Sequence, residues 1–360
     1  MTLPGLLFNN NKNNNKNNNK IITKKYIQIK RSKWPHITQP EAVAPITIHP
    51  AFEKAAHYFG VKIVHVGVDS NSRADVAQVR KAINANTIAL LASAPQYCHG
   101  VVDPIPELSA LALEKGLPLH VDACFGGFML PWVEKLGYPV PVFDFRNAGV
   151  TSMSADIHKY GFGPKGASVV LYRNGDIRKH QYFAYSTWPG GLFGSPSMAG
   201  TRPGGNIAQA WATLRHLGED GFTAMAKQLM GVTKDIQAAV QRIPELEIIG
   251  TPHMTCFAFQ SKLPAQFDIQ AFADVLEKKG WRLERQQLPS CIHCSIMPHH
   301  LKSKDRFIAD LAEAAETVRQ HPELAKTGTA AMYGMMAKLP DSGLLDDFVT
   351  GFFSEMYTNQ

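Results

Sequence analysis

From about Pro40 onwards, the chain alternates between two spacings of hydrophobic residues. Short continuous apolar runs predict buried strands, whereas apolar residues three and four positions apart predict helices. The strands predicted in the first half are residues 62–66, 87–93, 117–121, 150–153 and 167–172. The helices predicted between them are residues 52–59, 75–85 and 104–115. Because strands that alternate with helices form parallel sheets covered on both faces, this half predicts an α/β fold with a mainly parallel sheet.

The pattern changes after a glycine-rich stretch at residues 200–205. Beyond it, helices are predicted for residues 207–217, 222–241, 268–279 and 304–320, and strands for residues 246–250, 254–260, 281–288 and 291–297. Strands and helices interleaved on this shorter scale predict a smaller α+β domain. We therefore predict an Asn/Lys-rich tail that we expect to be disordered (1–34), a large domain (35–220) and a small C-terminal domain (221–360).

The net charge of +7 belongs in large part to the predicted tail. Residues 1–33 contain eight Lys and Arg residues and no acid. Such a run is typical of a solvated tail, so we expect no nucleic-acid partner. The five cysteines are scattered and odd in number, which favours free thiols in a reducing compartment, and no apolar run is long enough to cross a bilayer. We therefore expect a cytoplasmic chain without a transmembrane segment.

Two polar stretches directly follow predicted strands. One is His120-Val-Asp-Ala-Cys124 and the other is Ser154-Ala-Asp-Ile-His-Lys-Tyr160. Because the carboxyl ends of parallel strands meet at one edge of a sheet, we expect Asp122 and Lys159 to share a site. Pyridoxal 5'-phosphate needs an acid against its pyridinium nitrogen and a lysine that holds its aldehyde as a Schiff base. The pair predicts this cofactor, with Asp122 and Lys159 in those two roles.

Other residues could complete such a site. The ring of His49 could stack on the cofactor, although a histidine at the start of a helix is also a common structural feature. His158 could donate to the cofactor phosphate, and Lys165, beyond a Gly/Pro turn, could bind an anionic substrate. Arg202 lies in the glycine-rich loop ahead of a predicted helix, a place that favours anions.

A second cluster has the residue types of a zinc site. Cys291, His293 and Cys294 are followed by His299 and His300. In the predicted strand, however, Cys291 and His293 alternate with apolar residues, which favours packing in a core. We therefore predict no metal site.

Long motifs throughout the chain resemble those of one enzyme family. They are HPAFEKAAHYFG (49–60), APQYCHGVVDPIPE (94–107), PLHVDACFGGF (118–128), EKLGYPVPVFDFRNAGVTSMSADIHKYGFGPKGASVVLY (134–172), WPGGLFGSPSMAGTRPGG (188–205), KGWRLERQQLPSCIHCSI (279–296) and GTAAMYGM (328–335). From about residue 35 onwards the chain resembles sphingosine-1-phosphate lyases, which are pyridoxal phosphate enzymes of fold type I in the glutamate-decarboxylase-like group. The resemblance implies a fold-type I, transferase-like large domain. It also implies a lyase that cleaves the C2–C3 bond of a phosphorylated sphingoid base to a long-chain aldehyde and phosphoethanolamine.

The resemblance implies cofactor-binding roles residue by residue. It makes Lys159 the Schiff-base lysine and Asp122 the partner of the pyridinium nitrogen. It places His49 on the cofactor ring and His158 near the cofactor phosphate. Thr201 would reach the cofactor phosphate of a partner subunit, which implies a homodimer.

The resemblance also implies substrate contacts. Lys165 would bind the substrate phosphate, and Tyr97 would line the substrate pocket. Tyr97, Lys159 and His158 are the candidates for the base that takes the proton of the C3 hydroxyl group.

The beginning of the chain departs from the family pattern. Family members have a Gly-Gly-Thr/Ser loop there that cradles the cofactor phosphate, and eukaryotic members have a membrane anchor, whereas this sequence has an Asn/Lys repeat. Two alternative functions stay open at this point. One is an amino-acid decarboxylase with the same cofactor, which would need a cation for the α-carboxylate. The other is a non-catalytic remnant with a role in dimerisation, which the missing loop favours.

Overall fold

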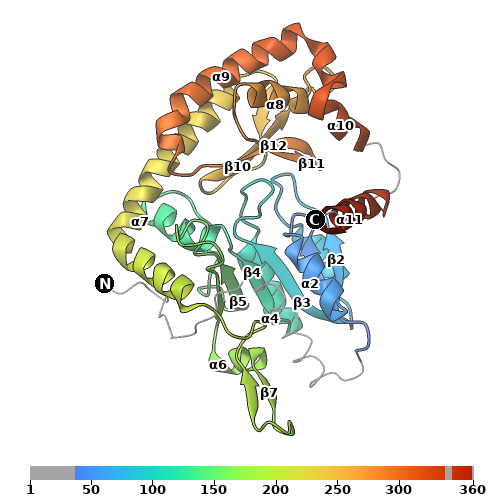
Figure 1. Ribbon diagram of the computed structural model, residues 1–360, viewed down its shortest axis with the longest axis vertical. Helices are drawn as coiled ribbons and strands as arrows, with labels where there is room; N and C mark the ends of the chain where they lie inside the picture. The colour runs from blue at the N-terminus through green and yellow to red at the C-terminus, as the bar shows by residue number, and fades with distance from the viewer. Residues whose placement is uncertain (1–36, 337–342, 359–360) are drawn as a thin grey trace. The chain divides into compact units, whose positions relative to one another are not determined.

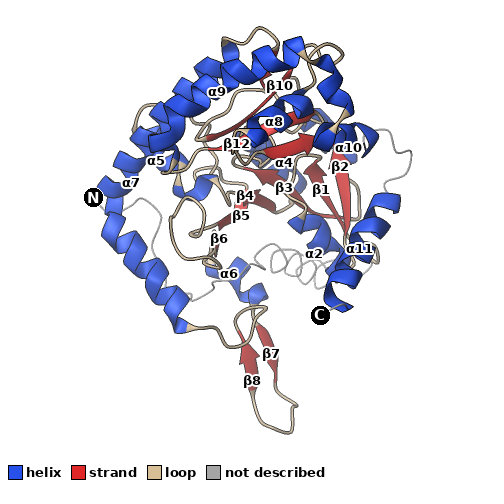
Figure 2. Ribbon diagram, turned by 45° about the horizontal axis from the view of Figure 1, so that its top comes forward, coloured by secondary structure: helices blue, strands red, loops and turns tan. Residues whose placement is uncertain are grey.

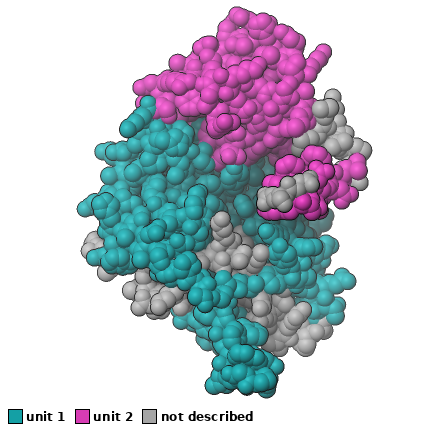
Figure 3. Space-filling view, viewed as in Figure 1, with its two compact units in different colours: residues 1–235, 248–258, 295–302 teal, residues 236–247, 259–294, 303–360 magenta. Residues whose placement is uncertain are grey.

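Two structural units divide the residues that the computed structural model describes, 37–336 and 343–358 (Figure 1). The first unit lies within residues 1–235, 248–258 and 295–302, and the second within residues 236–247, 259–294 and 303–360 (Figure 3). The predicted tail, 1–34, lies outside the described residues, and the predicted boundary at residue 220 stays a prediction. Within the described part of the chain, no helix combines the length and the apolar character that crossing a membrane requires.

A six-stranded sheet forms the centre of the first unit, in the order β2-β1-β3-β4-β5-β6. The strands are β1 (Glu41–Pro45), β2 (Lys62–Val66), β3 (Thr87–Ser93), β4 (Leu119–Asp122), β5 (Val150–Ala155) and β6 (Val169–Tyr172). All neighbouring pairs run parallel except β5 and β6, which are antiparallel. The prediction of an α/β fold with a mainly parallel sheet is confirmed.

Short helices connect the parallel strands. They are α2 (Ala51–Phe59), α3 (Val76–Ala82), α4 (Ile105–Lys115), the 3-10 turn η1 (Gly126–Phe128) and α5 (Leu130–Lys135). Helix α2 packs on β2, α3 on β1 and β2, and α4 on β3 and β4. Asp75 starts α3 by accepting hydrogen bonds from the backbone N–H groups of Ala77 and Gln78. These connections place the carboxyl ends of the parallel strands at one edge of the sheet.

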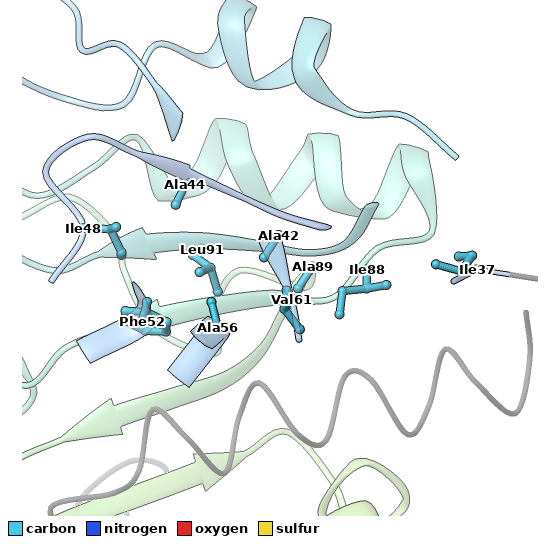
Figure 4. Close-up of a cluster of buried hydrophobic side chains, with 10 residues drawn as sticks. All are labelled: Ile37, Ala42, Ala44, Ile48, Phe52, Ala56, Val61, Ile88, Ala89 and Leu91. Atoms are coloured by element: carbon cyan, nitrogen blue, oxygen red, sulfur yellow. The ribbon is translucent and has the colours of Figure 1, made fainter. Parts of the chain in front are cut away.

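Strand β1 was not predicted, although it lies between β2 and β3. Its sequence, EAVAP, contains two alanines and a proline, which give only a weak strand pattern. Four of its five residues are nevertheless buried, because the strand is inside the sheet. Ala42 and Ala44 belong to a hydrophobic cluster whose largest member, Phe52 of α2, is fully buried (Figure 4). Burial of a phenylalanine side chain stabilises a fold by about 2–3 kcal/mol.

Beyond the sheet, the chain continues into a hairpin and a long helix, and residues 236–241 of this helix belong to the second unit. These elements are α6 (Gly175–Arg178), η2 (Lys179–Gln181), β7 (Phe183–Tyr185), β8 (Phe193–Ser195) and α7 (Gly204–Gln241). Strands β7 and β8 form a separate antiparallel hairpin that was not predicted (Figure 2). Two helices were predicted at 207–217 and 222–241, and α7 is indeed interrupted between them at Gly218, which has φ 55° and ψ −165°. Glycine tolerates this conformation because it has no Cβ atom.

The second unit contains most of a four-stranded sheet, in the order β11-β12-β10-β9. Its strands are β9 (Leu246–Ile248), β10 (Cys256–Ser261), β11 (Glu284–Gln287) and β12 (Ser290–Ser295). Its helices are α8 (Ile269–Lys278), α9 (His300–Gln320), the 3-10 turn η3 (Pro322–Lys326), α10 (Gly328–Met336) and α11 (Gly343–Thr358). Asp268 caps α8 by accepting from the backbone N–H groups of Gln270 and Ala271, and this helix buries Phe272 completely.

Candidate functional site

Two acidic residues stand at the carboxyl ends of neighbouring strands. Asp122 is the last residue of β4, in register with Ser93 of β3 and Ser154 of β5. Asp156 directly follows β5, which ends at Ala155. The carboxyl edge of a parallel sheet is where ligands of such folds bind, and both acids lie on it. This edge is the candidate site.

Asp122 is buried and held by hydrogen bonds to one of its two oxygens. Its Oδ1 accepts from the Ser154 hydroxyl group at 2.7 Å and from the Cys124 backbone N–H at 3.1 Å. Its side chain is only 2% exposed, and no ion pair within the described residues involves it. Burial of a carboxylate is costly without a cationic partner or further hydrogen bonds. The second oxygen, Oδ2, is therefore suited to accept from a cationic N–H of a ligand.

Lys159 lies on a tight turn between β5 and β6. The turn is closed by hydrogen bonds from the Lys159 N–H to the Asp156 carbonyl oxygen (3.2 Å) and from the Gly163 N–H to the Ile157 carbonyl oxygen (2.9 Å). A Cβ atom at Gly161 would stand 2.7 Å from backbone atoms of Ile157, so this turn requires glycine there. The turn replaces the helical connection used elsewhere in the sheet, and β6 consequently runs antiparallel to β5.

The amine of Lys159 points into a group of charged and aromatic side chains. Its Nζ lies 3.2 Å from Asp156 Oδ2 and 4.7 Å from the centroid of the Phe125 ring. Burial by itself lowers the pKa of Lys159, but its neighbours, Asp156 and Asp122 among them, raise this pKa above its ordinary value. Burial also raises the pKa of the Cys124 thiol well above its ordinary value. At neutral pH the site therefore contains an ammonium group and a neutral thiol.

His49 and Tyr97 approach the same site through aromatic contacts. His49 meets Tyr97 edge-on at 6.4 Å between ring centroids, and Tyr97 stacks on Phe125 at 5.6 Å. The Ala51 N–H donates to Nδ1 of His49 at 3.1 Å, so a neutral ring carries its proton on Nε2. Burial lowers the pKa of His49, an effect that the nearby charge of Asp122 opposes without cancelling. The structure thus brings His49, Tyr97, Asp122 and Lys159 together around a neutral imidazole.

His158 is fixed beside the lysine. Its Nδ1 lies 2.7 Å from the Ala167 carbonyl oxygen, to which it donates, and its Nε2 lies 3.6 Å from Asp156 Oδ2. The ring is therefore held between the β6 side of the turn and an acid. Its predicted contact with a cofactor phosphate stays a prediction.

Lys165 and Thr201 lie apart from this group. Lys165 is exposed on the turn that precedes β6, next to Gly166 with φ 90°. Thr201 is exposed at a pocket of about 600 Å³, which is lined by Gly200, Thr201, Arg202, Gly204, Ile207, Ala208 and Trp211. Arg202 donates from its guanidinium group to the Ser197 hydroxyl oxygen in the same loop. Within the described ranges, neither Lys165 nor Thr201 makes a hydrogen bond or ion pair with Asp122 or Lys159.

Three residues of the site were not predicted as functional. Asp156 pairs with Lys159, Phe125 lies between Tyr97 and Lys159, and Ser154 fixes Asp122. Asp156 could have been found from the sequence, because it precedes Lys159 by three residues in the same polar stretch. The other two become visible only when the strands pair.

The residues considered for zinc are divided between the units: Cys291, His293 and Cys294 belong to the second, and His299 and His300 to the first. Cys291, His293 and Cys294 are buried in β12, where Cys291 lies opposite Gln286 of β11. Among residues 37–336 and 343–358, no three His, Cys, Asp or Glu side chains gather closely enough to hold a metal ion.

Comparisons with known proteins agree on one family. Residues 23–262 match the pyridoxal-dependent decarboxylase conserved domain. Sphingosine-1-phosphate lyase of Arabidopsis thaliana is 45% identical over 335 residues, which are 93% of this chain and 60% of that protein. Sphingosine-1-phosphate lyase 1 of Rattus norvegicus is 42% identical over 325 residues, 89% of this chain and 57% of that protein. The chain thus spans about 60% of the length of these relatives.

Solved structures place the chain in the same family. The structure of the Burkholderia pseudomallei sphingosine-1-phosphate lyase has a TM-score of 0.81 and 43% identity, with 89% of this chain and 73% of that chain covered. The glutamate decarboxylase of Lactobacillus brevis, at 20% identity and a TM-score of 0.73, shares the fold, with 84% of this chain and 72% of that chain covered. The chain therefore belongs to the pyridoxal-dependent decarboxylase family and, within it, to the sphingosine-1-phosphate lyases.

Proposed function

We propose that this chain is a pyridoxal phosphate-dependent lyase. It cleaves the C2–C3 bond of a phosphorylated sphingoid base and yields a long-chain aldehyde and phosphoethanolamine. The observation that carries the proposal is the joint position of Asp122, Lys159 and His49 at the carboxyl edge of the sheet, in a member of this family.

The side chains of the site suit the cofactor. Asp122 is a buried carboxylate whose Oδ2 can accept from a protonated pyridine nitrogen, and Ser154 holds its other oxygen in place. His49 is neutral, so it can lie against an aromatic ring without adding a charge near the pyridinium. When bound, pyridoxal phosphate supplies an electron sink for the bond that breaks.

Lys159 would hold the cofactor through its amine and would release it when the substrate amine takes its place. Its amine must be neutral to attack an aldehyde, whereas Asp156 and Asp122 favour the ammonium form. Asp122 would pair with the protonated ring nitrogen of a bound cofactor, and this would weaken the effect of its carboxylate on the pKa of Lys159. Cofactor binding and deprotonation of Lys159 are thus coupled.

The remaining predicted residues act on phosphate groups and on the substrate. Lys165 is exposed on a rigid turn, free of any ion pair within the described residues, and it binds the substrate phosphate. Tyr97 lines the substrate pocket, and His158 lies near the cofactor phosphate. Tyr97, His158 and Lys159 are the candidates for the base at the C3 hydroxyl group.

A second copy of the chain completes the site. Thr201 lies in a pocket at the start of α7. As the resemblance to the family implies, it reaches the cofactor phosphate of a partner subunit. The glycine-rich loop before this helix offers backbone N–H groups to an anion.

The test is an assay of the full chain with pyridoxal phosphate and phosphorylated sphinganine. We expect release of a long-chain aldehyde and no carbon dioxide from amino acids. In Lys159→Ala we expect no aldehyde and no borohydride-stable attachment of the cofactor to the chain. The control is Lys179→Ala, a change at an exposed lysine. This variant should keep both aldehyde release and the borohydride-stable attachment of the cofactor. Decarboxylation without aldehyde release would favour the decarboxylase alternative, and absence of cofactor binding would favour the non-catalytic one.

A further inference from the structure

Asp156 connects three groups at the end of β5. Its Oδ2 lies 3.2 Å from Lys159 Nζ and 3.6 Å from His158 Nε2. Its Oδ1 accepts a hydrogen bond from the Ser168 hydroxyl group. The backbone N–H of Asp156 donates to the Cys124 carbonyl oxygen at 3.3 Å, which fixes its main chain to the end of β4.

The two acids of the site are held in the same way. A serine hydroxyl group on the neighbouring strand or turn donates to Oδ1 of each, Ser154 to Asp122 and Ser168 to Asp156. In both acids Oδ1 accepts from a serine hydroxyl group. Oδ2 of Asp156 points to the amine of Lys159, and Oδ2 of Asp122 is left for the cationic group of a ligand. The side chain of Asp156 is 14% exposed, so its interaction with the lysine is little screened by solvent.

From this geometry we infer that Asp156 is the positioning residue of Lys159. It directs the free amine toward the Asp122 side of the sheet edge and keeps it protonated whenever the lysine carries no cofactor. This inference rests on the proposed role of Lys159. Among the described side chains, only Asp156 forms an ion pair with Lys159.

Other titratable groups face the same amine. Asp122 and Cys124 lie at the end of β4, His49 precedes α2, His158 adjoins the lysine, and Cys256 starts β10. Burial raises the pKa values of both thiols, so they are neutral at pH 8.5, and His49 is neutral as well. Asp122 and Asp156 are thus the two negative charges near the amine. A neutral residue at position 156 removes the negative charge that lies within hydrogen-bond distance of the amine.

The test measures the reactivity of Lys159 in the full chain without cofactor. Cyanate reacts with neutral amines, and mass spectrometry reports its rate of addition at each lysine. An opposite charge at this distance shifts a pKa by about one to two units, so in Asp156→Asn the rate at Lys159 at pH 8.5 should rise about ten- to a hundredfold. Lys179, which pairs with Asp176 at the same sequence spacing but is exposed, is the reference lysine in the same sample.

Two control variants distinguish the effect of the Asp156 carboxylate on Lys159 from the general effect of removing an acid from the protein. In Asp176→Asn the rate at Lys159 should stay unchanged. Ser168→Ala keeps the carboxylate but removes its hydroxyl donor, so the rate at Lys159 should rise by less than in Asp156→Asn. If Asp156→Asn does not fold, the rate of cyanate addition at Lys159 in Ser168→Ala tests the inference instead. An unchanged rate in the folded variants, or an equal rise in Asp176→Asn, overturns the inference. Borohydride trapping of pyridoxal phosphate on wild-type Lys159 tests the proposed function separately, because the cyanate rates need no cofactor.

Discussion

The buried carboxyl group of Asp103 allows a quantitative test of how the free energy of unfolding depends on pH. Its side chain is completely buried, with Oδ1 accepting from the Ala74 N–H at 2.9 Å and Oδ2 accepting from the Ser93 N–H at 2.7 Å. Its own N–H donates to the Ser93 carbonyl oxygen at 3.0 Å. These bonds close the loop after β3 that carries Tyr97. The perturbation is Asp103→Asn, which keeps the shape of the side chain and removes its titration.

The magnitude follows from the pKa of Asp103. Burial raises this pKa from 3.8 to about 6, against the opposing effect of the two backbone donors. For an acid whose pKa is raised in the folded state, the folded state binds the proton more tightly than the unfolded state does. The stability contributed by protonation is therefore fully present below about pH 4 and is lost as the pH rises through about 6. A shift of about two units corresponds to about 3 kcal/mol.

The assay is urea unfolding, followed by circular dichroism between pH 4 and pH 8. The free energy of unfolding of the wild type relative to Asp103→Asn should fall by about 3 kcal/mol between pH 4 and pH 7. Asp176→Asn, at an exposed acid, should show the wild-type pH dependence. Parallel pH profiles for the wild type and Asp103→Asn would refute the reasoning, because Asp103 would then have the same pKa in the folded and the unfolded state.

Two further predictions concern the sheet edge. Ser154→Ala removes the hydroxyl donor to Asp122, so pyridoxal phosphate should bind about tenfold more weakly in a titration followed by absorbance, and unchanged affinity would contradict a role for this bond. Gly126→Ala should prevent accumulation of folded protein, because its Cβ would stand 2.1 Å from the Ala94 carbonyl oxygen. Gly175→Ala, whose Cβ would meet nothing within 4 Å, should melt within a few degrees of the wild type, and equal melting of both variants would disprove the close approach.

Local sequence patterns foresaw most of the large elements. Strand β3 was predicted with its observed bounds because five consecutive apolar residues, 88–92, form its centre, and all seven of its residues are buried. The interruption of α7 was foreseen because polar residues and glycine separate two helical patterns there. In contrast, β1 and the β7–β8 hairpin were missed. Short strands of this kind are stabilised by pairing with neighbours rather than by their own pattern.

The sequence by itself determined the fold class, the family, and the choice of Asp122 and Lys159. Each of these follows from residue types at fixed spacings along one segment. Only the tertiary structure decided which side chains surround Lys159. Asp156, Phe125 and Ser154 act through contacts made by strand pairing and by the turn after β5, and burial then sets the charge of each group. A carboxylate becomes a partner of an amine because the fold holds both within about 3 Å and away from water, and neither condition is written in a linear spacing.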